Sequence, residues 1–117
     1  MVDDDPGVQN LTRDFLELYG HSVLTAGSRG DALVQYEQRG KDISVVLLDV
    51  MASETAALDV FQKILDINPS AKIIVTSVYS HHWDGGNVFN RGAVGFLKKP
   101  YRMSELLQMV ERVQEMQ

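Results

Sequence analysis

Near its middle the chain reads Ile43-Ser-Val-Val-Leu-Leu-Asp49, a run that is apolar except for one serine and the closing carboxylate. A strand with one face in water alternates apolar and polar residues, whereas a parallel strand covered by helices on both faces is apolar almost throughout. We therefore predict that residues 43–49 form a central strand of a parallel sheet, with Asp49 at its carboxyl end.

Short apolar runs alternate with longer segments of helical periodicity on both sides of this strand. The alternation is typical of βαβ units, which build a doubly wound α/β fold with a parallel sheet between two layers of helices. Further strands are expected over Ser22–Ala26, Lys72–Ser77 and Val94–Leu97. Helices are expected over Pro6–Tyr19, Asp31–Gln38, Leu58–Ile67, Asn87–Arg91 and Ser104–Met116.

Length and composition restrict the class of protein. The chain has 117 residues, the size of one domain, and we expect residues 1–117 to form a single unit. Its net charge of −5 argues against a nucleic-acid binder, and no apolar run approaches the roughly 18 residues of a membrane span. Without cysteine it has no disulfide or thiolate metal site, and its acidic start is unlike a secretory signal. A cytoplasmic location is the expectation.

Polar side chains collect where the predicted strands end. Asp49 closes the central strand, Thr76 lies at the end of the next, Lys99 follows the last, and three carboxylates occupy residues 3–5. The carboxyl ends of parallel strands share one edge of the sheet, so these groups are expected to meet. Carboxylates stay ionised together when a cation lies among them, and an all-oxygen set suits Mg²⁺. A lysine and a threonine beside Mg²⁺ can hold a phosphoryl group, and an aspartate can accept one.

Four segments resemble the receiver domains of bacterial two-component response regulators. They are Val2-Asp3-Asp4-Asp5-Pro6, Val46-Leu47-Leu48-Asp49, Val75-Thr76-Ser77 and Gly92-Ala93-Val94-Gly95-Phe96-Leu97-Lys98-Lys99-Pro100, and together they span nearly the whole chain. The resemblance implies a flavodoxin-like sheet of five parallel strands in the order 2-1-3-4-5.

The resemblance implies that Asp49 is the phosphoacceptor and that Mg²⁺ is the cofactor. Asp3 and Asp4 would be the acidic pair that holds the metal, together with Asp49 and the backbone carbonyl of Met51. Asp5 replaces one of the pair if the register shifts by one residue. From the residues alone, Asp5 is equally well explained as the N-cap of the helix that begins at Pro6.

By the same resemblance, Thr76 and Lys99 would contact the phosphoryl group, and Phe96 would be an aromatic switch that turns inward when Thr76 moves. The switch would reshape the surface formed by the fourth helix, the fifth strand and the fifth helix. The implied partners are a sensor histidine kinase or phosphotransfer protein and a downstream protein or output domain, without direct contact to nucleic acid or membrane. The domain would be a monomer or a weak homodimer, and it would assist chemistry on itself without being a turnover enzyme.

Two other functions fit parts of the sequence. The family usually has Met-Pro and then Gly after the phosphoacceptor, where this chain has Ala52-Ser53 and Ala57. An altered loop favours a degenerate receiver that binds partners without phosphorylation. The second alternative is a phosphatase of the haloacid dehalogenase type, whose Asp-x-Asp motif is mimicked by residues 3–5, although no apolar strand precedes them.

The chain departs from the receiver family at one more position: before the second helix, Arg29 stands where that family has glycine.

The first predicted strand is short. Only Met1 and Val2 precede the acidic residues, whereas ordinary strands run about 5–6 residues. We therefore expect a truncated first strand and a chain that is a few residues short of a complete domain. The two neighbouring strands would then keep backbone groups without partners.

Overall fold

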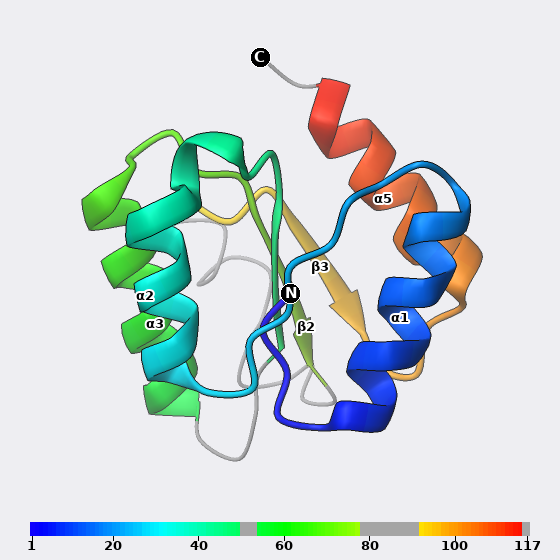
Figure 1. The fold of residues 1–117 in the computed structure, drawn as a ribbon, viewed down its shortest axis with the longest axis horizontal. Helices are drawn as coiled ribbons and strands as arrows, with labels where there is room; N and C mark the ends of the chain where they lie inside the picture. Colours follow the sequence, from blue (N-terminus) through cyan, green and yellow to red (C-terminus); the bar gives the residue numbers. More distant parts are fainter. Residues whose placement is uncertain (50–53, 78–91, 116–117) are drawn as a thin grey trace.

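The computed structural model describes residues 1–49, 54–77 and 92–115, which form a parallel sheet between two pairs of helices (Figure 1). The predicted helix over Asn87–Arg91 lies outside the described residues. The strands are β1 (Val46–Asp49), β2 (Ile73–Ser77) and β3 (Gly95–Lys98). The helices are α1 (Pro6–Leu18), α2 (Arg29–Arg39), α3 (Glu54–Ile67) and α5 (Met103–Glu115), with a short 3-10 helix η1 at Gly40–Asp42.

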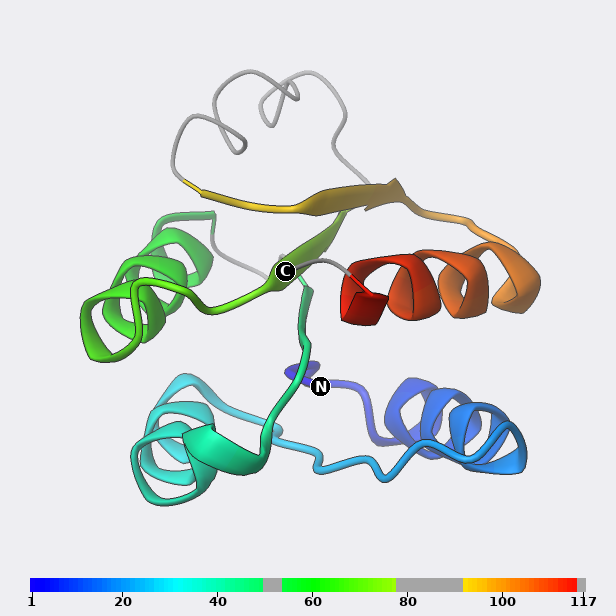
Figure 2. The same ribbon diagram turned by 90° about the horizontal axis from the view of Figure 1, so that it is seen from above.

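The three strands pair in parallel in the order β1-β2-β3. Single bridges extend the sheet beyond β1, because Val2 pairs with Leu48 on one side and with Ala26 on the other. The spatial order is therefore residues 22–26, residues 1–3, β1, β2 and β3, which is the predicted doubly wound order with a short first strand. Seen from above, α2 and α3 cover one face of the sheet and α1 and α5 cover the other (Figure 2).

The prediction of a regular strand over Ser22–Ala26 is wrong, since only Ala26 makes a bridge. Its neighbour in the sheet is the N-terminal segment: the Met1 ammonium donates to Leu24 O at 2.8 Å, and the Ala26 amide donates to Met1 O at 2.9 Å. Residues 22–25 make no bridge. The ladder therefore covers only the end of the predicted strand.

The central strand begins later than predicted, at Val46 and not at Ile43. Residues 40–42 form η1, and the amide of Ile43 donates to the carbonyl oxygen of Gly40 at 3.2 Å, so the chain enters the sheet from a tight turn. Pairing with β2 starts where the Val46 amide donates to Lys72 O at 2.8 Å. The helix predicted from Leu58 begins four residues earlier, at Glu54.

The start of α1 follows the predicted N-cap, and its end lies close to a glycine. The Asp5 carboxylate accepts hydrogen bonds from the amides of Gly7 at 2.9 Å and Val8 at 3.3 Å, and Pro6 occupies the first position of the helix. After the helix, Gly20 has a φ of +89°, a conformation that side chains with a Cβ rarely adopt. The cap fixes the N-terminus of α1 directly behind the acidic residues.

Alternate side chains of the sheet build two apolar cores. Leu48 and Ile73 face α2 and α3 and pack with Phe61, which is almost fully buried. Leu47 and Ile74 face the opposite way, toward α1 and α5, and belong to the second core. Because β1 and β2 are covered on both faces, their continuous apolar sequence is explained. The second core is completed from the helices and β3 by Leu16, Leu97, Leu106, Val110 and Val113.

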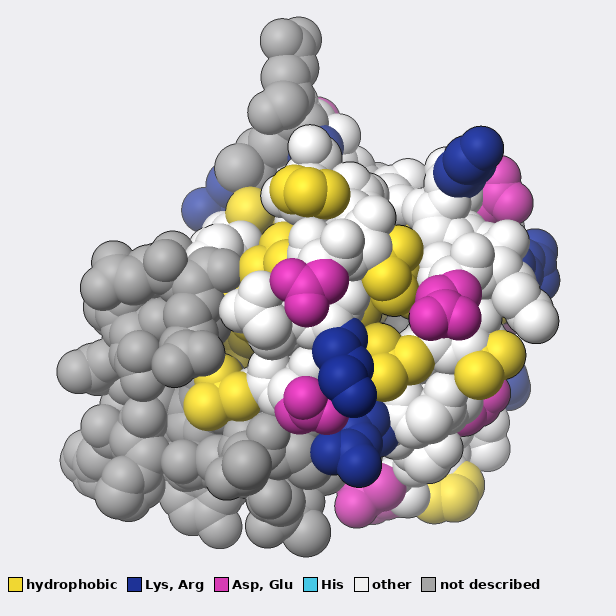
Figure 3. All heavy atoms as spheres, turned by 90° about the vertical axis from the view of Figure 1, so that its left-hand side faces the viewer, with side chains coloured by type: hydrophobic (Ala, Val, Ile, Leu, Met, Phe, Trp, Pro, Cys, Tyr) yellow, Lys and Arg dark blue, Asp and Glu magenta, His cyan; other side chains and the backbone are white. Residues whose placement is uncertain are grey.

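Arg29, which departs from the family pattern, begins α2 and pairs with α3 on the surface. Its Nη1 lies 3.2 Å from Oδ2 of Asp59, and the Nζ of Lys63 lies 3.3 Å from the same oxygen. Figure 3 shows basic and acidic side chains next to each other on this face of the molecule. Within the described part of the chain, no helix is long and apolar enough to cross a membrane.

Candidate phosphoryl-acceptor site

Asp49 and Thr76 are register neighbours at the carboxyl ends of β1 and β2. Both are buried, with Asp49 only 7% exposed, and the Thr76 hydroxyl donates to Oδ1 of Asp49 at 3.0 Å. The apolar strands bring these two polar side chains to the edge of the sheet, and the register places them opposite each other. The predicted meeting of the aspartate and the threonine is thus present in the structure.

Lys99 reaches the same carboxylate from the segment after β3. The Lys99 amide donates to Ser77 O at 2.8 Å, which continues the pairing of β2 and β3 by one residue. Its Nζ lies 2.7 Å from Oδ1 of Asp49 and 3.7 Å from Oδ2 of Asp3. Burial alone would lower the pKa of Lys99, but the hydrogen bond and ion pair with Asp49 and the charge of Asp3 raise it. The ammonium therefore stays charged beside Asp49.

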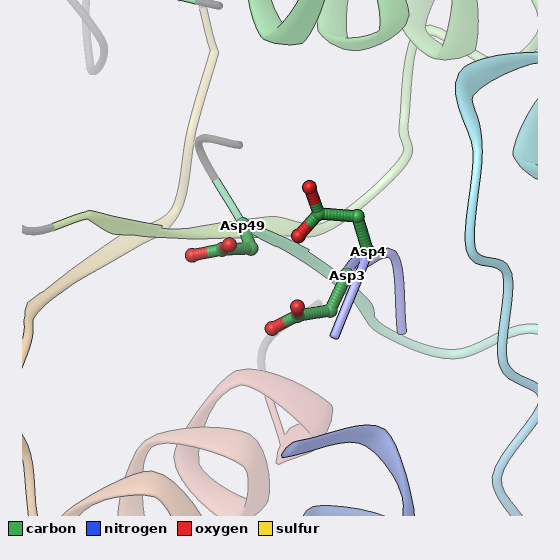
Figure 4. Close-up of side chains that lie close together, drawn as sticks. All are labelled: Asp3, Asp4 and Asp49. Carbon is green, nitrogen blue, oxygen red and sulfur yellow. The ribbon is translucent and has the colours of Figure 1, made fainter. Parts of the chain in front are cut away.

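Asp3 and Asp4 follow the bridge residue Val2 and face Asp49 (Figure 4). One carboxylate oxygen from each of the three residues lies within 4.8 Å of the others. Asp3 is buried and Asp4 is exposed, so the group is open to solvent on one side. Burial raises the pKa of Asp3, the charges of Asp49 and Asp4 raise it further, and the Asp5 amide and Lys99 oppose the shift.

Asp5 has a different task from Asp3 and Asp4. Its carboxylate accepts the amides of Gly7 and Val8 at the start of α1, as the N-cap interpretation predicts. Its own amide donates to Oδ1 of Asp3 at 2.9 Å. The structure therefore brings Asp3 and Asp4 together with Asp49 and turns Asp5 toward the helix.

The donor set fits a hard divalent cation. The three carboxylates offer only oxygen ligands, and burial, followed by the charges of Asp49 and Asp4, raises the pKa of Asp3, so that a cation among them would favour the ionised form. Mg²⁺ binds such sets through one or two carboxylates and keeps several waters, for which the exposed side at Asp4 leaves access. The residues present can thus hold Mg²⁺.

One further predicted site residue lies away from this cluster. Phe96 is on β3, pairs in register with Val75 and packs, half-buried, against the core below α2 and α3. Met51 lies outside the described residues.

Sequence reasoning missed Tyr101, whose pKa is raised by burial and is also influenced by the charges of Lys99, Asp49 and Asp3. Its position two residues after Lys99 was the available signal.

A family model of the response regulator receiver domain matches residues 1–111 of the chain. The chain belongs to this family. The receiver domain is 27% identical over 114 residues to the chemotaxis protein CheY of Thermotoga maritima, covering 97% of this chain and 93% of that protein. It is also similar to the solved structure of a response regulator from Thermotoga maritima, at 26% identity and a TM-score of 0.85, covering 98% of this chain and 94% of that one.

Other relatives are much longer than the receiver domain. It is 30% identical over 112 residues to the DNA-binding transcriptional regulator NtrC of Azospirillum brasilense, which covers 96% of this chain but 23% of that protein. The chain therefore spans less than a quarter of the NtrC relative and nearly all of the CheY relative. Receiver domains are regulatory modules of two-component systems, and their acidic pockets generally bind Mg²⁺.

Proposed function

We propose that this receiver domain accepts one phosphoryl group on Asp49 from a histidine kinase or phosphotransfer protein, with Mg²⁺ held by Asp3, Asp4, Asp49 and the carbonyl of Met51. The observation that carries the proposal is the contact of the Asp49 carboxylate with both the Thr76 hydroxyl and the Lys99 ammonium. A carboxylate so placed has a hydrogen-bond donor and a positive charge ready for the oxygens of an incoming phosphoryl group.

The transfer is a displacement at phosphorus. A carboxylate oxygen of Asp49 forms the new bond to phosphorus, the bond from phosphorus to the donor's imidazole nitrogen breaks, and that imidazole nitrogen takes up a proton. Bound Mg²⁺ supplies charge neutralisation for the phosphoryl oxygens. Lys99 Nζ, now 2.7 Å from Oδ1 of Asp49, is close enough to follow the charge as it moves onto those oxygens.

Signalling follows from the movement of Thr76. In the state described here its hydroxyl donates to Asp49, and a phosphoryl oxygen would compete for that hydrogen bond. Thr76 pairs with Leu97 in the sheet, next to Phe96, so a shift at Thr76 acts directly on β3. We infer that Phe96 turns inward and changes the surface made by β3, α5 and the segment that precedes β3, where a downstream protein or output domain binds.

The wider setting is part of the same proposal. Residues 1–117 would form one cytoplasmic domain that acts alone, as the length of the CheY relative suggests, or at the head of a larger regulator, as in the NtrC relative. It would act as a monomer or weak homodimer and would not turn over substrate. A degenerate receiver remains the alternative because of Ala52-Ser53, which lie outside the described residues; the phosphatase alternative leaves Asp49 without a role.

Intact mass after incubation with Mg²⁺ and a small acyl phosphate tests the proposal. We expect one added phosphoryl group on the wild-type chain, none on Asp49→Asn, and one on the control Asp42→Asn, which removes an exposed carboxylate remote from the cluster. A wild-type chain without an adduct supports the degenerate receiver. Continuous phosphate release without an adduct supports the phosphatase.

A further inference from the structure

Gln9 is a half-buried polar side chain in the first turn of α1 that the phosphoryl site does not use. Its Nε2 donates to the backbone carbonyl oxygen of Asp3 and, at 2.9 Å, to that of Ala26. Both partners are acceptors, so only the amino group of the carboxamide can face them. Gln9 therefore joins the N-terminal segment to its neighbour in the sheet.

Gln9 donates to the carbonyl oxygen of Asp3 at the point where the backbone pairing of Asp3 ends. The Asp3 amide donates to Ala26 O at 3.0 Å, and a continuing parallel ladder would return the amide of residue 28 to the carbonyl of Asp3. The chain leaves the sheet at that point, because Ser28 becomes the N-cap of α2 and accepts the Asp31 amide at 3.2 Å. The side chain of Gln9 supplies the donor that the departing strand does not.

The start of α1 holds Gln9 in this position. The Gln9 amide donates to the carbonyl oxygen of Asp5 at 3.0 Å, and Asp5 caps the helix through its carboxylate. The Asp5 amide also donates to Oδ1 of Asp3 at 2.9 Å. Hydrogen bonds thus fix both the backbone and the carboxylate of Asp3 relative to the first turn of α1.

We propose that Gln9 is a positioning residue for the divalent-cation site, which sets the direction of the Asp3 and Asp4 carboxylates by clamping the carbonyl of Asp3 against Ala26. The inference rests on the proposed function, since it assumes that these carboxylates bind Mg²⁺. Residues 1–3 are held in the sheet by single bridges at Val2, so a side-chain clamp has more influence here than beside a long strand. Loss of hydrogen bonds that orient metal ligands typically lowers metal affinity 10-fold to 100-fold.

The test compares Gln9→Met, which keeps the length of the side chain without its donors, with Gln35→Met. Gln35 Nε2 donates to the carbonyl oxygen of Thr25 at 2.9 Å and to Oδ2 of Asp31 at 3.2 Å, so the control removes a similar amide contact that does not involve Asp3. Calorimetric titration with Mg²⁺ should show about tenfold weaker binding for Gln9→Met and wild-type affinity for Gln35→Met. The Mg²⁺ concentration that gives half-maximal phosphorylation should rise by a similar factor for Gln9→Met and stay at the wild-type value for Gln35→Met.

The results distinguish failure of the Mg²⁺ site from failure of the positioning role of Gln9. Equal Mg²⁺ affinity in Gln9→Met and wild type, with a lowered unfolding temperature alone, means a structural role and overturns the inference. A wild-type chain that binds no Mg²⁺ overturns the cation site and the inference together. If Gln9→Met does not fold, the shorter amide of Gln9→Asn takes its place: it can reach fewer carbonyls and should weaken Mg²⁺ binding by a smaller factor, and unchanged affinity overturns the inference.

Discussion

At Asp3, a cation site requires a charged carboxylate, whereas burial in the folded chain favours the neutral form. The Asp3 side chain is buried, and burial raises its pKa above the ordinary value of 3.8, with further contributions from the charges of Asp49 and Asp4. A carboxyl group whose pKa is higher in the folded state binds its proton more tightly there. The contribution of protonated Asp3 to the free energy of unfolding is therefore present at low pH and is lost as the pH rises through the folded-state pKa.

We predict that Asp3→Asn stabilises the metal-free chain at pH 7 by about 1 kcal/mol, because the buried charge is removed. The gain should vanish as the pH falls below the ordinary carboxyl range, where Asp3 is protonated in both states. Urea unfolding in the presence of a chelator measures it, with the exposed Asp4→Asn as the control that changes less. Added Mg²⁺ should stabilise the wild type and not Asp3→Asn; a wild type that matches Asp3→Asn in the chelator at pH 7 would contradict the prediction.

At the scale of the elements, strands and the groups at their carboxyl ends could be predicted, whereas contacts that follow no such pattern could not. The apolar runs predicted β1 and β2 because burial on both faces leaves a direct mark on the sequence, and the strand-end rule then placed Asp49 and Thr76 together. The contact of Gln9 with Ala26 joins residues 17 positions apart, and no local pattern indicates it. Residues 22–25 carry strand-like sequence, yet their pairing depends on a partner segment elsewhere in the chain.

The turn into β3 provides a prediction at this scale. Gly92 has a φ of +111°, and a Cβ at this position would lie 3.2 Å from Cδ1 of Leu65 on α3. Gly92→Ala should therefore cost about 1–2 kcal/mol of unfolding free energy. Gly30→Ala, in α2 where nothing lies within 4 Å of the added Cβ, should be neutral or stabilising by up to about 1 kcal/mol. Equal unfolding midpoints for the two variants would contradict this account of the turn.

At the scale of the whole molecule, the sheet has an opening beside Met1. A cavity of about 470 Å³ lies among the N-terminal segment, residues 21–26, residues 42–47 and the helices on both faces. Backbone groups of successive strand residues point to opposite neighbours. The Val46 amide donates toward β2, so the amide of Leu47 points toward the N-terminal segment, as does Leu47 O, which accepts the amide of Val2. On the far side, Leu24 O accepts the Met1 ammonium, so the Leu24 amide faces the same cavity. The amides of Leu47 and Leu24 thus face each other across a gap in which one strand would fit.

We predict that four β-branched residues added before Met1 continue the first strand and stabilise the domain by about 2 kcal/mol, since buried side chains and new ladder bonds outweigh the cost of ordering the segment. The residue directly before Met1 would offer its carbonyl to Leu47, and the one before that to Leu24. Thermal unfolding measures the gain, and slower exchange of the Leu24 and Leu47 amides locates it. An added Gly-Ser-Gly-Ser segment is the control for length, because it is flexible and has little apolar side chain to bury in the cavity. If both extensions leave the unfolding temperature and the exchange of these two amides unchanged, the opening does not accept a strand and the prediction is wrong.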